Sequence, residues 1–379
     1  MNTAWDITGP EVLIGRHVHS TQGARTTYST KIAAFDLDAT LVVTKSGKFT
    51  AVESEDWDWW HASVPARLKQ ISEEGYDIII VTNQGRLTMR NGTKSPIAYL
   101  FQSKIESIFH ALEVPATIYA ACANDIWRKP RTYAWDHYIQ TILPSQAVDL
   151  SGSYFVGDAA GRPQDHTDAD RHFSMNVGIR FYTPEEYFLE ARSESWEHKF
   201  DPSRHYQPAP CIHATPKPPQ VISLVLLVGL PGSGKTTYYQ KNLQSFGYDR
   251  IGASSGTTEQ QAIAMAEESL EAQKTVVVDG WNLEPSSRKL WLAIGRTHGV
   301  AVFAVHINTV PQLCLHNDAV RALGSTQEVR AVHPRLAFWD LVRSFQPPQK
   351  AEGFDCVFEI DFNWTGPPEA LKTWRKFWI

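Results

Sequence analysis

The amino-acid sequence predicts an α/β protein with two doubly wound parallel-sheet domains. Short apolar runs alternate with amphipathic stretches in two separate series, and a proline-rich segment lies between the series. The length of 379 residues also matches two domains of roughly 100–200 residues each. Repeated β–α units form right-handed crossovers, and such crossovers produce parallel sheets with helices on both faces.

The first series of elements occupies residues 31–200, and residues 1–30 before it are expected to be an N-terminal arm or an edge strand. Apolar runs in this series predict buried strands, and the stretches between them have the spacing of amphipathic helices. The expected strands are Ile32–Phe35, Ile78–Val81 and Tyr154–Val156, and the expected helices include Val64–Glu74 and Ser95–Leu112.

A linker is predicted at residues 201–220, which contain six prolines. Proline is excluded from helix interiors and central strands, so this segment joins two domains rather than contributing to one. The second series follows at residues 221–379. Its expected strands, each followed by a helix, are Leu224–Val228, Thr275–Val278 and Val300–His306.

The composition is that of a soluble intracellular protein. The formal net charge of −5 provides no general attraction for nucleic acid, so a polyanion would need a local basic groove. The four cysteines are far apart and are expected to be reduced. The longest apolar run, Val221–Leu230, is half of the roughly 20 residues needed to cross a bilayer, so no membrane association is expected.

Four polar motifs follow one another in the first domain, three of them at the ends of predicted strands. Because the carboxyl ends of parallel strands meet at one edge of a sheet, these motifs should line one crevice. The motifs are Asp36-Leu37-Asp38-Ala39-Thr40, Thr82-Asn83, Arg128-Lys129-Pro130, and Gly157-Asp158-Ala159-Ala160-Gly161-Arg162 with Asp170 farther on.

These residue types suit the hydrolysis of a phosphate monoester. A carboxylate nucleophile divides this slow reaction into two steps through a covalent intermediate. Mg²⁺ would offset the repulsion between carboxylate and phosphate, and a second carboxyl would protonate the leaving oxygen. A hydroxyl and a lysine would hold the phosphoryl oxygens. Any motif alone could be a solvated turn, a helix cap or a loop, but those explanations do not account for all four in this order.

The four motifs resemble those of the haloacid-dehalogenase superfamily. This resemblance implies that Asp36 is the nucleophile and Asp38 the general acid and base. Thr82 and Lys129 would bind the phosphoryl group, and additional phosphate ligands would be Asn83 and Arg128.

The same resemblance implies a magnesium site. Asp36, the backbone carbonyl of Asp38, and Asp158 would hold Mg²⁺, with Asp170 as structural support. Ala39 stands where many members of the superfamily have glycine, and its methyl group could crowd the loop. The segment between the first two motifs is too short for a folded cap domain, so an open site that admits a polymer end is expected.

A phosphate-binding loop opens the second domain. The strand Leu224–Val228 runs directly into a GxxxxGK[ST] motif, whose backbone N–H groups cradle phosphates. Lys235 would reach the β- and γ-phosphates of ATP, and Thr236 would bind Mg²⁺. Asp279 either contacts that Mg²⁺ through water or caps the next turn. The predicted nucleotide-binding residues of the loop are Gly229, Gly232, Ser233, Gly234, Lys235, Thr236 and Thr237.

The order of the two domains resembles the polynucleotide kinase 3′-phosphatases, which process DNA ends. Further matches include Ser46-Gly47-Lys48, Thr183-Pro184-Glu185-Glu186, His316-Asn317 and Ala351-Glu352-Gly353-Phe354. The resemblance implies removal of 3′-phosphates from DNA strand breaks, phosphorylation of 5′-hydroxyls with ATP, a nuclear location, and DNA repair proteins as partners. We expect no forkhead-associated domain, because the chain offers no room for one before residue 31.

The kinase half departs from this family. Ser254 stands at the position of the general base, and Ala253 replaces a neighbouring arginine. A later helix lacks another arginine, at Ala319, although Arg321 remains as a nucleotide ligand. Loss of a positioned base typically costs about 10²–10⁴-fold in rate, so we expect a nucleotide-binding domain with poor or no kinase activity. The alternative is an altered register that brings Asp249 to the base position.

Two other functions remain open from the sequence alone: an end-binding repair adaptor without turnover, and a small-metabolite phosphatase fused to a nucleotide-binding module. DNA contacts are expected from a basic cluster at the mouth of the site, Arg128, Lys129, Arg131 and Arg162. Tryptophans could stack on unpaired bases or pack against the core, and the candidates are Trp57, Trp59, Trp60 and Trp127.

Overall fold

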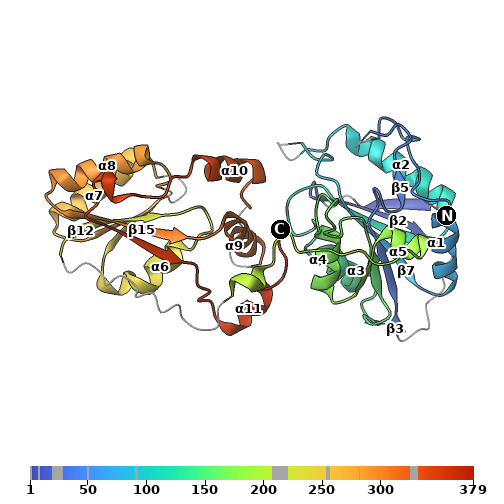
Figure 1. Ribbon diagram of the computed structural model, residues 1–379. Coiled ribbons are helices and arrows are strands. Elements are labelled where there is room, and N and C mark those ends of the chain that lie inside the picture. Colours follow the sequence, from blue (N-terminus) through green and yellow to red (C-terminus); the bar gives the residue numbers. More distant parts are fainter. Residues whose placement is uncertain are drawn as a thin grey trace. The chain divides into compact units, whose positions relative to one another are not determined.

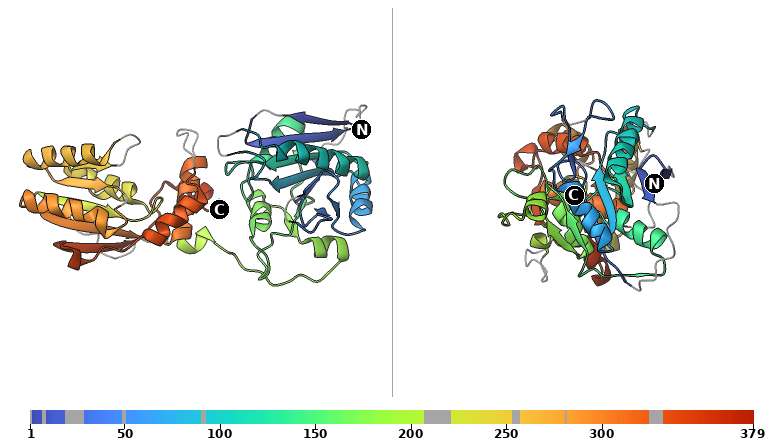
Figure 2. Two further views of the ribbon diagram at one scale, coloured as in Figure 1. Left: turned by 90° about the horizontal axis from the view of Figure 1, so that it is seen from above. Right: turned by 90° about the vertical axis from the view of Figure 1, so that its right-hand side faces the viewer.

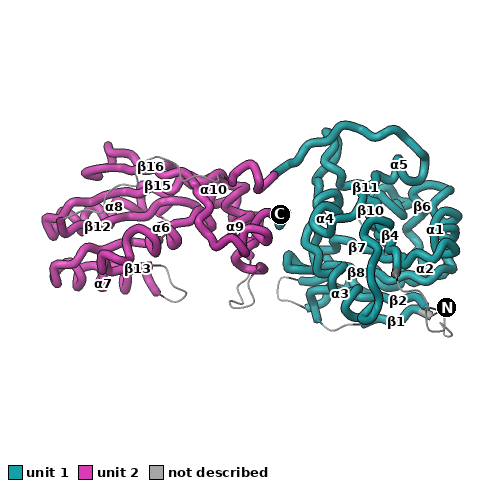
Figure 3. The backbone as a smooth tube through the Cα atoms, turned by 90° about the horizontal axis from the view of Figure 1, so that it is seen from below, with its two compact units in different colours: residues 1–200, 377–379 teal, residues 201–376 magenta. Residues whose placement is uncertain are grey.

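The computed structural model forms two compact units (Figure 3), one of Met1–Phe200 with Phe377–Ile379 and one of Asp201–Lys376. We call them unit 1 and unit 2. The structure describes residues 2–6, 9–18, 29–48, 51–89, 93–206, 221–252, 257–280, 282–324 and 332–379. Among these residues, no helix has the length and apolar character needed to cross a membrane.

Unit 1 is built around a seven-stranded sheet with the order β1-β2-β8-β7-β4-β10-β11 (Figure 3). From β8 to β11 all neighbouring strands are parallel, whereas β1 and β2 are antiparallel additions at one edge. The strands are β1 (Asn2–Asp6), β2 (Val12–Val18), β4 (Ile32–Phe35), β7 (Asp77–Asn83), β8 (Ala116–Ala121), β10 (Tyr154–Val156) and β11 (Arg180–Tyr182). The predicted α/β class is confirmed.

Of the two alternatives for residues 1–30, the edge strand is confirmed for the described residues, because β1 is the edge strand of the sheet, and the separate arm is wrong. Strand β2 pairs with β8 and with β1, and Leu13 and Ile14 are each only 1% exposed. Only half of β2 is apolar, because Gly15, Arg16 and His17 follow the apolar residues. No strand period was therefore visible in the sequence, and pairing with β8 is what buries this segment.

Helices cover both faces of the unit 1 sheet (Figures 1 and 2). Alternate residues of β4 point to opposite faces, so Ala33 and Phe35 pack with α1, α2 and α5, while Ile32 and Ala34 pack with α3 and α4. The elements are α1 (Val64–Glu73), α2 (Ile97–Leu112), α3 (Tyr133–Ile142), α4 (Ala169–Val177) and α5 (Pro184–Leu189), with two small pairs, β3 (Ser29–Thr30) with β9 (Ala147–Val148) and β5 (Val42–Val43) with β6 (Asp58–Trp59).

Unit 2 contains a five-stranded sheet with the order β13-β14-β12-β15-β16, and all its neighbours are parallel. Helices α7 and α8 pack on one face and α6 on the other. The strands are β12 (Ser223–Val228), β13 (Asp249–Gly252), β14 (Val276–Asp279), β15 (Ala301–Asn308) and β16 (Cys356–Asp361). The helices are α6 (Lys235–Asn242), α7 (Glu259–Glu271), α8 (Pro285–Thr297), α9 (Pro311–Leu323), α10 (Arg335–Ser344) and α11 (Pro368–Trp374), with short 3₁₀ turns η1 (Pro202–His205), η2 (Gln244–Phe246) and η3 (Lys350–Glu352).

The start of the predicted linker 201–220 is an ordered part of unit 2, which corrects that boundary. Asp201 accepts a hydrogen bond from the backbone N–H of Ser203 at 2.9 Å and so caps η1, which packs against α9. Residues 207–220 lie outside the described residues.

The last three residues return to unit 1, which the sequence did not predict. The Phe377 N–H donates to Asn176 Oδ1 at 2.9 Å, and Asn176 Nδ2 donates to the Phe377 carbonyl at 2.7 Å. The Phe377 ring stacks on the His172 imidazole with centroids 3.7 Å apart. Both partners lie on α4, so the end of the chain packs against that helix.

Candidate active sites

Asp36 and Asp170 share one buried ammonium in unit 1. Asp36 is the first residue after β4, and Lys129 Nζ donates to its Oδ1 at 2.5 Å. The same Nζ lies 2.7 Å from Asp170 Oδ1, at the start of α4. The Lys129 side chain is only 2% exposed, so both ion pairs are shielded from water. Three segments far apart in sequence thus meet at a single cation.

The backbone of Lys129 is held by the amide of Asn83 at the end of β7. Asn83 Oδ1 accepts from the Lys129 N–H at 2.9 Å, and Asn83 Nδ2 donates to the Lys129 carbonyl at 3.2 Å. Thr82, 2% exposed, precedes Asn83 on the same strand. A Cβ added at Gly85 would lie 3.5 Å from Arg128 Nη1, which locates that guanidinium beside the loop after β7. The structure therefore brings the four predicted phosphate-binding residues together.

Asp158 completes a group of three carboxylates with Asp36 and Asp170, whose ligand atoms all lie within 4.8 Å of one another. Burial and the charge of Asp170 raise the pKa of Asp158 to about 7. Burial also raises the pKa of Asp36, although the Lys129 ammonium opposes that change. A divalent cation would offset the repulsion among these carboxylates, and their oxygen donors are the ligands that Mg²⁺ prefers. The donor set therefore fits Mg²⁺.

Lys129 stays charged in this environment. Burial alone would lower its pKa, but the charges of Asp170 and Asp36 outweigh that effect and raise the pKa of the ammonium. An ammonium that remains protonated can hold the negatively charged oxygens of a phosphoryl group.

Asp38 has a different environment from the other carboxylates, because its side chain is about half exposed. Its Oδ1 accepts from Lys104 Nζ at 3.2 Å and its Oδ2 accepts from Gln84 Nε2 at 2.6 Å. Gln84 Nε2 also donates to Thr82 Oγ1 at 3.0 Å and so connects two predicted site residues. The sequence analysis missed Gln84 and Lys104. Gln84 directly follows the Thr82-Asn83 motif, whereas Lys104 carried no signal beyond its place on a predicted helix.

Asp170 was predicted as structural support, and the structure places it in contact with Lys129 and with the loop that carries Asp158. Besides its ion pair with Lys129, its Oδ2 accepts from the Ala159 N–H at 3.1 Å, next to Asp158. A Cβ added at Gly157 would lie 2.3 Å from Asp170 Oδ2, so glycine is required there. The available signal was the second DxD pattern, Asp168-Ala169-Asp170, but its distance in sequence from Lys129 hid the pairing.

The loop that carries Asp36 accommodates Ala39. Its φ is 57°, in the left-handed region that favours glycine, and its N–H donates to the Val42 carbonyl at 2.9 Å. A non-glycine residue there costs about 1–2 kcal/mol. The methyl group is tolerated without displacing Asp36 or Asp38 from the positions described above.

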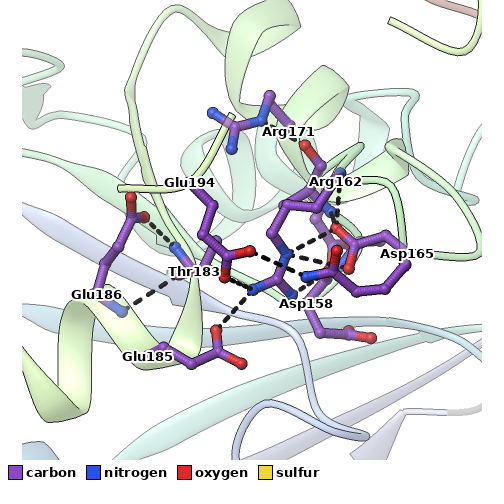
Figure 4. A network of polar contacts seen from close by, with 12 residues as sticks. Asp158, Arg162, Asp165, Arg171, Thr183, Glu185, Glu186 and Glu194 are labelled. Atoms are coloured by element: carbon purple, nitrogen blue, oxygen red, sulfur yellow. Dashed lines mark hydrogen bonds and ion pairs between the residues drawn. The ribbon is translucent and has the colours of Figure 1, made fainter. Parts of the chain in front are cut away.

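Arg162 is a structural residue, and its predicted place in a basic mouth is wrong (Figure 4). Its Nε donates to both carboxylate oxygens of Asp165 at 3.0 Å, and its Nη1 donates to Glu185 Oε2 at 2.9 Å. The residue is only 5% exposed, and its Nη2 donates to the Asp158 carbonyl at 3.3 Å. Acidic neighbours therefore neutralise Arg162, and it braces the loop that carries Asp158.

Arg131 and the tryptophans also pack rather than face a ligand. Arg131 is 6% exposed, its Nη1 donates to Asn124 and to the Asp125 carbonyl, and burial lowers its pKa to about 10. Trp127 packs among aromatic neighbours and meets Tyr133 edge-to-face, with ring centroids 4.6 Å apart. The core of unit 1 also contacts the other three candidates, Trp57, Trp59 and Trp60. The packing explanation of these tryptophans is therefore supported.

The phosphate-binding loop of unit 2 connects β12 to α6. Gly229, Gly232 and Gly234 have φ values of 152°, 81° and 107°, which only glycine adopts without strain. A Cβ at Gly232 would lie 2.1 Å from the Cys314 carbonyl oxygen of α9. Close approach of α9 thus requires glycine at this position. Ser233 next to it is buried, and Thr237 lies exposed on α6.

Lys235 and Arg321 lie near each other at this loop. Lys235 Nζ donates to the Gly229 and Leu230 carbonyls at 2.7 and 3.0 Å. Burial lowers the pKa of Lys235 to about 8, and Arg321 contributes to that decrease. Arg321 Nη2 lies 3.2 Å from Asp318 Oδ1 on α9.

Asp279 at the end of β14 faces the loop rather than capping a turn. Its Oδ2 accepts from Thr236 Oγ1 at 2.7 Å and from Arg250 Nη2 at 2.6 Å. The sequence analysis did not single out Arg250, because an isolated arginine at an edge strand carries no motif.

The base position of the expected kinase cannot be filled by Asp249. Strand β13 pairs Asp249 with Val276 and Gly252 with Asp279, so Asp249 is at the opposite end of the strand from the loop. Asp249 Oδ2 there accepts from Ser269 and from Lys274. The altered-register alternative is therefore wrong. Ala253 and Ser254 lie outside the described residues.

Comparisons with known proteins match both units. A family model described as polynucleotide kinase 3 phosphatase matches residues 31–188, and one described as AAA domain matches residues 224–348. The chain is 32% identical over 171 residues to the polynucleotide 3′-phosphatase ZDP of Arabidopsis thaliana, covering 42% of this chain and 24% of that protein.

A second relative matches almost the whole chain. The bifunctional polynucleotide phosphatase/kinase of Schizosaccharomyces pombe is 35% identical over 353 residues, which cover 92% of this chain and 82% of that protein. The chain therefore belongs to the family of bifunctional polynucleotide phosphatase/kinases.

Proposed function

We propose that unit 1 removes the 3′-phosphate from DNA strand-break ends through an aspartyl-phosphate intermediate. The observation that carries this proposal is the buried Lys129 ammonium between Asp36 and Asp170, with Asp158 beside them at the carboxyl ends of β4 and β10. A nucleophile, a cation for the phosphoryl oxygens and a set of metal ligands thus occur in one place. The names of the two relatives support a polynucleotide as substrate.

In the first step, an Asp36 carboxylate oxygen attacks the phosphorus, and the bond between phosphorus and the 3′-oxygen breaks. Asp38 donates a proton to the leaving 3′-oxygen, which becomes a hydroxyl. Lys129 and Thr82 hold the equatorial oxygens, where negative charge accumulates.

In the second step, water attacks the phosphorus of the aspartyl phosphate. Asp38 accepts a proton from that water, the bond to Asp36 breaks, and inorganic phosphate leaves. Asp36, Asp158 and the Asp38 carbonyl would hold Mg²⁺, which would supply the positive charge that lets a carboxylate approach a phosphate. Asp38 is suited to both proton transfers because it is the half-exposed carboxylate of the group.

For unit 2 we propose binding of ATP at the loop from Gly229 to Thr237, with impaired phosphorylation of 5′-hydroxyls. The loop has the glycine conformations that phosphate binding needs, and Lys235 lies within it. The serine at position 254 provides no effective base near neutral pH, and Asp249 points elsewhere. Because the proposed substrate is a DNA strand-break end, we also propose that the chain acts in DNA repair in the nucleus, with other repair proteins as partners.

The test is a nicked duplex with a 3′-phosphate and a 5′-hydroxyl, incubated with the full chain, Mg²⁺ and ATP while both ends are followed. We expect loss of the 3′-phosphate, abolished in Asp36→Asn, and an unchanged 5′-hydroxyl. Persistence of the 3′-phosphate would reject the phosphatase. Phosphorylation of the 5′-hydroxyl at about 1–100 per second, lost in Lys235→Ala, would reject the impaired kinase.

A competition assay separates polynucleotide from small-metabolite substrates. Free sugar phosphates in excess should leave hydrolysis of the 3′-phosphorylated oligonucleotide unchanged. Strong inhibition by sugar phosphates would favour a metabolite phosphatase, and tight binding to the nick without any turnover would favour an end-binding adaptor.

A further inference from the structure

The cation cradle of the phosphate-binding loop in unit 2 is filled by a side chain of the protein. In such loops the hydroxyl after the lysine and an acid from a neighbouring strand serve the magnesium that accompanies the nucleotide. Here these groups are Thr236 and Asp279, whose Oγ1 and Oδ2 are 2.7 Å apart. Arg250 contacts both of them.

Arg250 binds Asp279 along one edge of its guanidinium. Its Nε and Nη2 lie 2.8 and 2.6 Å from Asp279 Oδ2, and Nη2 is 3.4 Å from Thr236 Oγ1. The Asp279 side chain is 2% exposed, whereas that of Arg250 is 39% exposed. The carboxylate is thus buried and neutralised, and its partner faces solvent at the loop.

The position of Arg250 on strand β13 places its side chain beside Asp279. Strand β13 lies beside β14, and its residue Ile251 packs in the core on the face covered by α7 and α8. Alternation along the strand turns Arg250 to the other face, where its guanidinium lies 5.6 Å from the centre of the Tyr239 ring of α6. The strand register therefore places Arg250 on the face of the sheet where it reaches Asp279 and Tyr239.

Magnesium and this arginine are incompatible at one carboxylate oxygen. Mg²⁺ requires near-octahedral oxygen ligands at about 2.0–2.1 Å, and a guanidinium that donates two hydrogen bonds to Oδ2 occupies that approach. An arginine also remains charged at any physiological pH, so it does not vacate the site by losing its proton. Oδ2 of Asp279 is therefore not open to direct coordination of a magnesium ion while Arg250 is in place.

The second carboxylate oxygen of Asp279, Oδ1, indicates that an additional ligand binds here. Oδ1 is buried and has no hydrogen-bond partner among the residues that the structure describes. Asp279 as a whole is 7% exposed. An unpaired buried oxygen is costly, so a water or a ligand hydroxyl is needed next to it once the loop is filled.

We propose that Arg250 replaces the divalent cation in unit 2, so that the loop binds the polyphosphate of a nucleotide without Mg²⁺. A guanidinium has five N–H donors, and the contacts with Asp279 use one edge of it, which leaves donors for phosphate oxygens. Lys235 supplies the second positive charge from within the loop. The inference rests on the nucleotide binding proposed above, and it adds that this binding does not require a divalent cation.

The test is calorimetric titration of the full chain with a non-hydrolysable ATP analogue, once in EDTA and once in MgCl₂. We expect dissociation constants that agree within about threefold for the unchanged chain. Arg250→Ala should bind at least about tenfold more weakly in EDTA and regain affinity when Mg²⁺ is added. Arg250→Lys, which keeps the charge but not the fork, should be intermediate. Lys235→Ala should abolish the heat in both buffers, which assigns the binding to the loop.

Two results would overturn the inference. One is binding by the unchanged chain that tightens at least about tenfold with Mg²⁺. The other is an Arg250→Ala variant whose dissociation constants in EDTA and in MgCl₂ have the same ratio as those of the unchanged chain. Either result would leave nucleotide binding itself intact. Absence of heat with every protein in both buffers would instead reject nucleotide binding in unit 2. A far-UV circular dichroism spectrum and a thermal unfolding curve that match those of the unchanged chain serve as the check that the variants fold, because phosphatase activity reports on unit 1 and Arg250 belongs to unit 2.

Discussion

Lys129 shows how one buried charge can organise several acidic residues. Its ammonium is shared by Asp36 and Asp170, and a neutral residue there would leave two carboxylates close together without compensation. Removing one partner from a buried ion pair typically costs about 3–5 kcal/mol, because the remaining charge is unpaired. The same arrangement suits catalysis, since a phosphoryl group brings new negative oxygens to an ammonium that is already in place.

Asp170→Asn tests the role of the carboxylate that the sequence identified only as support. We expect the apparent affinity for Mg²⁺ and the 3′-phosphatase rate to fall by about 10–100-fold, because one of three clustered carboxylates is lost. The measurement is a magnesium titration of phosphatase activity. The matched control is Asp136→Asn, also in the first turn of a helix but exposed. Equal magnesium dependence in Asp170→Asn and the unchanged chain would contradict the assignment.

His316 gives unit 2 a specific dependence on pH. It is buried on α9, its Nε2 donates to the Trp374 carbonyl at 2.8 Å, and burial lowers its pKa from 6.5 to about 4. Between these values the unfolded chain binds more protons than the folded chain. The free energy of unfolding should therefore fall as the pH decreases from about 6.5 to 4, by about 2–4 kcal/mol from this residue.

The measurement is urea denaturation of the full chain at several pH values in that range. His316→Gln should be less dependent on pH than the unchanged chain, whatever its stability at pH 7. His298→Gln, at the end of α8 in the same unit, is the control and should keep the original dependence. Identical pH slopes for His316→Gln and the unchanged chain would contradict the prediction, because they would mean that the imidazole binds its proton equally well in the folded and unfolded chains.

At the scale of elements, the loop between β10 and α4 is held by Arg162. Asp165, Glu185 and the Asp158 carbonyl all accept from its guanidinium, so residues of the loop and of α5 are joined at one buried group (Figure 4). Buried arginine forks of this kind restrict geometry more than a single hydrogen bond does. The position of Asp158 therefore depends on a contact to a later helix.

Arg162→Met should destabilise unit 1 by about 3–5 kcal/mol, because Asp165 would remain buried without its partner. The measurement is thermal inactivation of the 3′-phosphatase, which reports on unit 1. Arg180→Met removes an exposed arginine of β11 and should change stability by no more than about 0.5 kcal/mol. Comparable inactivation of the two variants would mean that the ion pairs of Arg162 contribute little.

At the scale of the whole chain, unit 1 includes the last three residues of the sequence, which pack against its helix α4. Phe377 stacks on His172, whose Nε2 lies 2.8 Å from His198 Nδ1 and 3.3 Å from Asp168 Oδ2. The two imidazole centroids are 5.1 Å apart, the separation of rings joined end to end by a hydrogen bond. His198 and Phe377 thus pack against His172 of α4, the helix whose first turn contains Asp170.

Phe377→Ala should lower the stability of unit 1, although residue 377 follows the whole of unit 2 in the sequence. Loss of a half-buried aromatic contact predicts a cost of about 1–3 kcal/mol. The measurement is again the temperature at which phosphatase activity is lost. The control is Phe246→Ala, a phenylalanine of unit 2 that is 57% exposed and should leave that temperature unchanged. An unchanged inactivation temperature in Phe377→Ala would show that the terminal contact is dispensable.

The sequence by itself determined the two α/β units, the central strands, and which motifs lie at their carboxyl ends. These features depend on short-range patterns: apolar runs mark β4, β10 and β12, and the residues directly after them must lie at the edge of a sheet. The loop at Gly229–Thr237 was equally readable, because its glycines and its strand–loop–helix setting are contiguous in the chain.

Only the tertiary structure decided which charged side chains meet and which are buried. Asp170 reaches Lys129 from 41 residues away, and Arg250 reaches Asp279 from a neighbouring strand 29 residues away. Arg162 could equally have faced DNA until its acidic partners on α5 were known. Such pairs depend on strand register and on the burial of each side chain, and these are set by contacts between segments that no local pattern of residues encodes.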